Sequence, residues 1–180
     1  MFEIWPWPWL VALAMGAEFC LRWPSRLTHP VVWIGHLIGL LEKRWNHSSA
    51  SEQTLKRRGI ATVIILVTTA ALVGLGVQLV LVRTFHEWGA LVAALVGIAG
   101  LAAGSLHQHV AAIIRPLSDG NLAQARIKVG YIVGRDTAVM DQTDVATAAL
   151  ESLAESFNDG VVAPVFWFCI GGLPALFAYK

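Results

Sequence analysis

Residues 60–82 form a run of 23 amino acids without a single charged side chain. As a helix, such a run is about 35 Å long, which is enough to cross the ~30 Å hydrocarbon core of a bilayer. A second uncharged run, of 19 residues, covers 88–106. A soluble chain of this size has little interior in which to bury two such helices. We therefore expect an all-α fold in which both runs cross a membrane.

Two further apolar runs cover 5–21 and 161–179. The second contains Pro164, Gly171, Gly172 and Pro174, so we expect a bent or broken helix there. Charged residues make up only 14% of the chain, against ~25% in an average soluble domain. The prediction is a polytopic helical membrane protein with one membrane domain over 1–180 and four transmembrane segments, at 5–21, 60–82, 88–106 and 161–179.

The basic residues predict the orientation of these helices. Eleven of the 13 Lys and Arg residues lie in 22–59 and 107–160, and basic loops stay in the cytoplasm. We therefore expect a multi-pass protein of the cell (inner) membrane, with 107–160 as a helical cytoplasmic segment. The formal net charge is only +1, which gives no field to attract nucleic acid. The bilayer is the expected partner, and a homo-oligomer is compatible with the sequence.

Shorter features complete this outline. The apolar run 30–41 is too short to cross a membrane and predicts a re-entrant or interfacial helix, and 45–54 predicts a loop. Cys20 and Cys169 lie among apolar residues and are expected to be buried thiols. His107 and His109 are two residues apart, which favours hydrogen-bonded histidines over a shared metal ion.

The cytoplasmic segment is expected to hold two helices. The first covers 122–133 and is ended by Gly134; the second begins at Asp141 or Thr143 and ends at 158–160. Apolar residues recur every four positions in the second helix and predict one buried stripe. The stripe consists of Val145, Ala149, Leu153 and Phe157.

Three carboxylates share one edge of the second helix. Glu151 and Glu155 are four residues apart, and Asp159 lies a further four along. Like charges at this spacing cost a few tenths of a kcal/mol, so a cation should compensate them. Mg²⁺ is one candidate, since it prefers oxygen ligands from one or two carboxylates plus phosphates. The alternative is a solvated acidic face, paired with Arg126, Lys128 or Arg135.

Residues 134–137 (GRDT) form a second polar cluster. The planar guanidinium of Arg135 suits a phosphate or a carboxylate, and Gly134 permits close approach of the backbone. The same four residues also fit a helix stop followed by a turn with a surface arginine.

Three motifs, taken in order, resemble those of the adenosylcobinamide-phosphate synthase family of cobalamin biosynthesis. They are HPVVWIGHLI at 29–38, GRDT at 134–137 and ESLAESFNDGVVAPVFW at 151–167. The chain departs from the family at 22–24, where RWP replaces an acidic residue and Gly-Asp-Pro. The family pattern continues with further motifs and membrane segments. We therefore expect 1–180 to match only the N-terminal part of a full member and to be an incomplete form.

The resemblance implies an acid–amine ligase. Such an enzyme joins adenosylcobyric acid to aminopropanol phosphate with hydrolysis of ATP, giving adenosylcobinamide phosphate. A carboxylate is a poor electrophile, so ATP would convert it to an acyl phosphate that the amine attacks. ATP and Mg²⁺ are thus the implied cofactors, and the corrinoid is a substrate. Mg²⁺ and basic groups would stabilise the charge of the transferring phosphoryl group.

The resemblance also implies roles for individual residues. The expected metal ligands are Glu151, Glu155 and Asp159. The expected catalytic residues are Arg135, Asp136, Glu155 and Asn158. The expected substrate-binding residues are His29, Arg135 and Thr137.

A second function belongs to a different class. A related group of membrane proteins senses β-lactam stress for β-lactamase induction, without enzymatic activity, and has a similar Ala-Pro-x-Phe-Trp stretch. The motifs at 134–137 and 151–155 favour the synthase over this signalling group. A plain helical scaffold would leave the three carboxylates unexplained.

Overall fold

The computed structural model describes residues 7–21, 28–47, 50–134 and 136–180. All regular elements of these residues are helical, which confirms the predicted all-α class. The α-helices are α1 (Trp7–Leu21), α2 (Pro30–Trp45), α3 (Glu52–Phe85), α4 (Gly89–Gly97), α5 (Ala103–Ser118), α6 (Leu122–Val129), α7 (Gln142–Phe157) and α8 (Ala163–Tyr179). Short 3-10 turns cover His86–Trp88 and Ile98–Gly100, and a π-helical turn covers Asn158–Val162.

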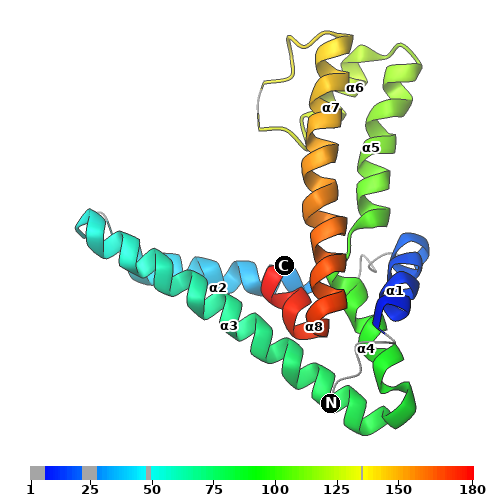
Figure 1. Cartoon of the computed structure of the whole chain (residues 1–180). Helices are drawn as coiled ribbons and strands as arrows, with labels where there is room; N and C mark the ends of the chain where they lie inside the picture. The colour runs from blue at the N-terminus through cyan, green and yellow to red at the C-terminus, as the bar shows by residue number, and fades with distance from the viewer. Residues whose placement is uncertain (1–6, 22–27, 48–49, 135) are drawn as a thin grey trace.

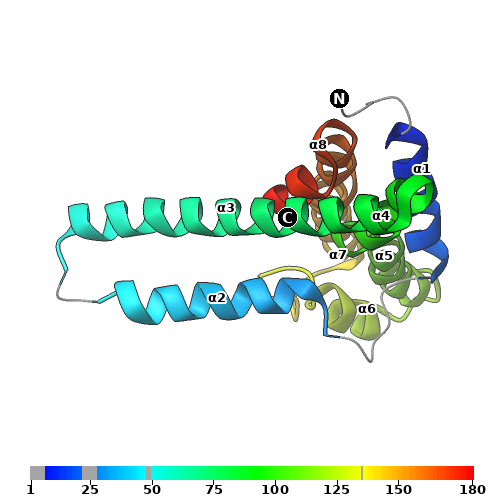
Figure 2. The same cartoon turned by 90° about the horizontal axis from the view of Figure 1, so that it is seen from below.

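The helices form two arms that meet at a junction. One arm is the long helix α3 with α2 running antiparallel beside it; the other consists of α5, α6 and α7 (Figures 1 and 2). Helices α1, α4 and α8 lie at the junction, where the first apolar core contains Val11, Ala93, Phe168, Leu173 and Leu176. A second core fills the α5–α7 arm and contains Ile113, Ala125, Val129, Val145 and Ala148.

Helix α3 contains the expected 60–82 segment. Its 34 residues span about 51 Å. Large apolar side chains lie exposed along it, with Ile60, Val63 and Leu72 between 53% and 61% exposed. By length and hydropathy, Glu52–Ser118 and Gln142–Tyr179 both contain helical stretches able to cross a membrane. An exposed apolar surface of this kind fits a lipid environment.

The expectation of one helix over 88–106 is wrong. Helix α4 ends at Gly97, a 3-10 turn follows, and Leu101 is extended (φ −106°, ψ 154°) before α5 begins. Two contacts satisfy backbone N–H groups at the break. The Gly104 N–H donates to the buried Glu18 carboxylate at 2.8 Å, and the Ala102 N–H donates to the Gly160 carbonyl at 3.1 Å. Such partners make a helix break stable where water is scarce.

The 161–179 segment bends back on itself instead of running straight. Gly172 has φ 62° and ψ −151°, a conformation that favours glycine. The Leu173 N–H freed by the bend donates to the side-chain Oε1 of Gln78 on α3, at 2.9 Å. The expected bend is therefore confirmed. The end of the segment also returns to its beginning, because Tyr179 and Lys180 lie beside Asp159.

Close packing of α8 against α3 holds this bend in place. A Cβ atom on Gly74 would lie 2.6 Å from the Leu173 carbonyl oxygen, so only glycine lets the two backbones approach so closely. Gln78 is 5% exposed. A buried amide with a backbone partner thus lies at the point where α8 turns.

Several expectations for local structure are corrected or confirmed. Helix α6 ends at Val129, before Gly134, because the chain turns at Gly130 and a 2.6 Å hydrogen bond from Arg126 Nε to the Met140 carbonyl fixes the following loop. Helix α7 begins directly after Asp141, one of the two expected caps, which forms a capping box with Asp144. It does not stop at 158–160 but continues through the π turn into α8.

The remaining expectations concern burial and shorter helices. Cys20 is exposed, so the prediction of a buried thiol is wrong there. Val145 and Ala149 of the predicted stripe are buried, whereas Phe157 is 50% exposed. The helix expected at 30–41 extends to Trp45 as α2, none of whose residues is buried. The described helix of the 5–21 segment has 15 residues, about 22 Å.

Candidate functional site

A polar groove lies where α5 begins, α7 passes into α8 and the described chain ends. Its volume is about 300 Å³. Its lining residues are Ala102, Ser105, Leu106, His109, Ser156, Asp159, Gly160 and Lys180. They come from three elements that are distant in sequence, so the fold rather than a local motif assembles this groove.

The π turn Asn158–Val162 positions one wall of the groove. Gly160 is buried, and its carbonyl accepts the Ala102 N–H from the break before α5. A Cβ atom on Gly160 would lie 3.3 Å from the Ala102 Cβ, a tight contact. The two irregular backbone segments therefore face each other. Single π turns within α-helices occur frequently at functional sites.

Asp159 is the polar centre of this wall. Its Oδ1 accepts hydrogen bonds from Asn158 Nδ2 at 2.9 Å and from the Tyr179 hydroxyl at 3.4 Å. The Lys180 ammonium donates to the Asp159 backbone carbonyl at 3.4 Å. The bend at Gly172 brings Tyr179 and Lys180 to this position. A carboxylate and an ammonium group thus lie together at the rim of the groove.

His29 belongs to the same neighbourhood. Its Nδ1 accepts the Val31 N–H at 3.3 Å and caps α2. Burial, and secondarily the positive charge of Lys180, lower the pKa of the His29 imidazole below its ordinary value. Both effects favour the neutral form of the ring. The structure thus brings together three of the expected site residues, His29, Asn158 and Asp159.

The sequence did not point to the other groove residues. Lys180 and Tyr179 reach Asp159 only because α8 turns back, and this path is set by Gly172 and Gln78 together. Ser105 lies outside the three motifs, and Ser156 lies within the motif at 151–167 but was not assigned a role. His109 Nδ1 lies 2.7 Å from the Ser105 carbonyl oxygen, which confirms the expectation of a hydrogen-bonded histidine.

The three carboxylates expected to bind Mg²⁺ are all exposed on α7 and the π turn. In the part of the chain that the structure describes, no group of three or more His, Cys, Asp or Glu side chains is arranged to hold a metal ion. The donor chemistry still suits Mg²⁺, because Glu155 and Asp159 offer carboxylate oxygens four residues apart and phosphates commonly supply further ligands. Glu151, which lies one helical turn before Glu155, has an interaction partner of its own.

The GRDT motif lies in the loop between α6 and α7. Arg135 is outside the described residues. Asp136 Oδ1 accepts the Ala138 N–H at 2.9 Å, and the half-buried Thr137 accepts the Met140 N–H through its carbonyl at 3.3 Å. The loop is joined to α7 by a 3.3 Å bond from Ser152 Oγ to the Ile132 carbonyl. Among the described residues, neither Asp136 nor Thr137 lines the groove.

Comparison with known proteins identifies relatives of this chain. "Cobalamin biosynthesis protein CobD" of Rhodobacter capsulatus is 42% identical over 175 residues, which is 95% of this chain and 54% of the relative. The protein of the same name from Brucella suis is 42% identical over 89% of the chain and 48% of the relative. That of Pelobacter propionicus is 38% identical over 97% and 53%. No solved structure matches.

The chain spans about half the length of these curated relatives. The family model described as "CobD/Cbib protein" matches residues 11–180. This match includes α2, the GRDT loop, the acidic edge of α7 and the groove. By this match and by the identity to curated relatives, the chain belongs to the CobD/CbiB protein family.

Proposed function

We propose that this chain acts in cobalamin biosynthesis as the N-terminal part of a membrane-bound amide ligase. The proposed reaction joins adenosylcobyric acid to aminopropanol phosphate, uses ATP and yields adenosylcobinamide phosphate. Family membership and the names of the relatives support the pathway. The motifs at 134–137 and 151–167 support this step over a signalling role.

The observation that carries the proposal is that Asp159 and Lys180 line one groove. His29 is close enough to Lys180 to feel its charge. Both phosphate-bearing substrates are anions. The Lys180 ammonium and the hydroxyls of Ser105 and Ser156 are donors suited to phosphate oxygens. A neutral His29 can hydrogen-bond a substrate without adding charge. Cationic, neutral and anionic groups therefore lie within one small region.

In this proposal the ligation proceeds in two steps. A carboxylate oxygen of the corrinoid attacks the γ-phosphorus of ATP, releasing ADP and forming an acyl phosphate. The amine nitrogen then attacks the acyl carbon; a C–N bond forms, the C–O bond to phosphate breaks, and the amine gives up a proton. Glu155 is the proposed acceptor of that proton, since its carboxylate is exposed and one turn from Asp159.

The other site residues bind and orient. Arg135 and Lys180 would neutralise phosphate charge, and Asp136 would orient Arg135. His29 and Thr137 would contact substrate, and Asn158, which already bonds Asp159, would hold that carboxylate in place. Mg²⁺, held by Glu155 and Asp159 with Glu151 nearby, would supply charge neutralisation on the phosphates. The proposed location is the cytoplasmic face of the inner membrane, where 22–59 and 107–160 carry their basic residues.

A chimera tests the proposal. Residues 1–180 replace the matching part of the Rhodobacter capsulatus relative, and the product is expressed in a bacterium that lacks its own synthase. Growth on cobyric acid is expected, because the chimera supplies the missing ligation. Glu155→Gln should lower product formation at least ~100-fold, and added cobinamide should restore growth.

The matched control is Glu87→Gln, which removes one exposed carboxylate after α3. It should leave turnover unchanged. Wild-type turnover in Glu155→Gln would remove that residue from the reaction. A chimera that inserts in the membrane but gives no product would overturn the ligase proposal and favour the signalling class.

A further inference from the structure

The end of the α2–α3 hairpin carries a cluster of basic side chains, here called the basic tip. Its members are Lys43, Arg44, Lys56, Arg57 and Arg58. Glu42 and Glu52 are the acidic residues of the same stretch, so positive charge is in excess. The tip projects away from the junction and from the α5–α7 arm (Figures 1 and 2).

Most of these cations are uncompensated. Within the described residues, the side chains of Lys43, Arg44, Lys56 and Arg57 are exposed and form neither a hydrogen bond nor an ion pair. Arg58 is half-buried, and its Nη1 donates to the Trp45 carbonyl at 2.8 Å. This bond ties α3 to the end of α2 and holds the guanidinium beside the hairpin.

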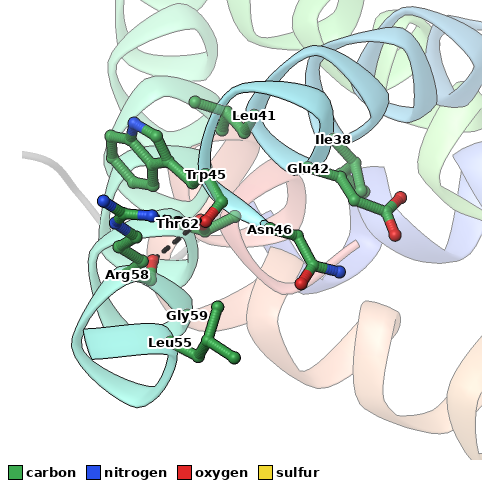
Figure 3. Close-up of a pocket in the computed structure, with 9 residues that line it drawn as sticks. All are labelled: Ile38, Leu41, Glu42, Trp45, Asn46, Leu55, Arg58, Gly59 and Thr62. Atoms are coloured by element: carbon green, nitrogen blue, oxygen red, sulfur yellow. Dashed lines mark hydrogen bonds between the residues drawn. The ribbon is translucent and has the colours of Figure 1, made fainter. Parts of the chain in front are cut away.

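A groove of about 490 Å³ opens between the two helices at the tip (Figure 3). Its lining residues are Ile38, Leu41, Glu42, Trp45, Asn46, Leu55, Arg58, Gly59 and Thr62. Ile38, Leu41 and Leu55 supply apolar surface, whereas Arg58 and Asn46 supply polar groups. The groove therefore offers an apolar wall directly beside cationic side chains.

The position of the tip relative to the apolar run decides which ligand fits. The uncharged segment 60–82 begins two residues after Arg58, so the basic tip lies at headgroup level when that segment crosses a bilayer. Basic clusters next to a transmembrane helix attract anionic lipid, by roughly fivefold in affinity for each Lys or Arg. A soluble anion would contact the cationic side chains but would make no contact with the apolar wall of the groove.

We propose that the basic tip and its groove bind one anionic phospholipid. The lipid phosphate contacts Lys43, Arg44 and Arg58, and the upper part of one acyl chain lies against Ile38 and Leu41. This site is separate from the groove at Asp159, and its occupancy does not depend on the proposed ligase reaction. It requires only that 60–82 crosses the membrane.

Photo-crosslinking in nanodiscs tests this site. The full chain is placed in phosphatidylcholine nanodiscs with a small amount of phosphatidylglycerol that carries a diazirine on its acyl chain. Mass spectrometry should locate the crosslinks within 38–62, and the same probe with a choline headgroup should label this region at least ~5-fold less. Equal labelling by both headgroups would overturn the proposal.

Charge variants identify the headgroup contacts. Lys43→Gln with Arg44→Gln removes two cations and should lower labelling roughly 25-fold. The matched control, Arg83→Gln with Arg115→Gln, removes two exposed cations elsewhere and should label as wild type. If both double variants lose labelling equally, the loss depends only on net charge, and this outcome would overturn the proposed site. Circular dichroism checks folding, and the single change Arg44→Gln replaces the double variant if that variant does not fold.

Two further measurements separate the parts of the site. Ile38→Trp fills the groove without changing charge and should abolish labelling at 41–55; undiminished labelling would place the acyl chain elsewhere and contradict the proposal. Millimolar inorganic phosphate should not compete with the lipid probe. Displacement by phosphate would assign the cations to a soluble anion instead.

Discussion

The Lys180 ammonium donates to the Asp159 carbonyl oxygen at 3.4 Å although 21 residues separate the two. A straight helix of that length would hold them about 31 Å apart, which is the thickness of the hydrocarbon core. The bend at Gly172 therefore brings the end of the 161–179 segment back beside its beginning. We predict that both ends of this segment lie on the same side of the membrane.

Single-cysteine labelling tests this topology. In a chain with Cys20→Ser and Cys169→Ser, cysteines at Ser156 and Lys180 should react with an impermeant maleimide from the same side of oriented vesicles. The reason is that the segment between them folds back on itself at Gly172. Cysteines at Gln53, near the start of α3, and at Glu87, just after its end, serve as the control and should react from opposite sides. Opposite sidedness for 156 and 180 would mean that the segment crosses.

The close contact between α3 and α8 makes a second prediction. Gly74→Ala should destabilise the fold by about 1–3 kcal/mol, since its Cβ would meet the Leu173 carbonyl at 2.6 Å. Gly76 lies two residues along the same helix, and a Cβ atom there would have no neighbour within 4 Å. Gly76→Ala should therefore be neutral or stabilise the fold by up to ~1 kcal/mol. Thermal unfolding in detergent, followed by circular dichroism, measures both. Similar effects of the two changes would contradict the packing described.

The side chain of Gln78 gives a third prediction. Gln78→Leu leaves the buried Leu173 N–H without its acceptor, which should cost about 1–3 kcal/mol. Gln78→Glu keeps an acceptor oxygen at the same reach and should retain the bend. Gln53 is exposed, so Gln53→Leu is the control for loss of an amide. It should change the free energy of unfolding by less than ~0.5 kcal/mol. Chemical denaturation in micelles distinguishes the three variants.

The lowered pKa of His29 predicts a pH dependence. The native state favours the neutral imidazole more than the unfolded chain does, so protonation favours unfolding. The contribution of His29 to stability should be complete above its unfolded pKa of about 6.5 and should decrease as pH falls below it. Protonation of Nδ1 also removes the acceptor for the Val31 N–H.

The variant His29→Asn isolates this effect, because asparagine caps a helix well at every pH. Between pH 7.5 and pH 5.5 the wild type should lose more of its unfolding free energy than the variant. His29→Ala should lose the cap at both pH values, at a cost of about 1 kcal/mol. Parallel pH profiles for the wild type and His29→Asn would show that His29 does not titrate with folding.

Features encoded by neighbouring residues were predictable from the sequence. The uncharged run predicted the core of α3, and Asp141 predicted the start of α7, because a capping box is built from residues three apart. The glycine and proline pattern predicted the bend in α8. The motifs also indicated the family, whose match covers 11–180.

Features that depend on contacts between distant residues were not predictable. The break after Gly97 is stable because Glu18 and Gly160 supply partners from α1 and the π turn, and no local pattern reveals them. Lys180 reaches Asp159 through a bend that Gln78 supports from α3. The acidic spacing 151–155–159 was visible, but its assembly with His29 and Lys180 required the tertiary path of α8.

The bond between Glu18 and Gly104 also affects how the chain is made. The carboxylate is 4% exposed and its partner lies 86 residues later. At about 5–20 residues per second, the ribosome needs roughly 4 to 17 s to synthesise that interval. Until then the Glu18 carboxylate lacks its Gly104 partner and is best solvated by water or lipid headgroups. The contact between α1 and the start of α5 therefore forms only after the start of α5 has left the ribosome.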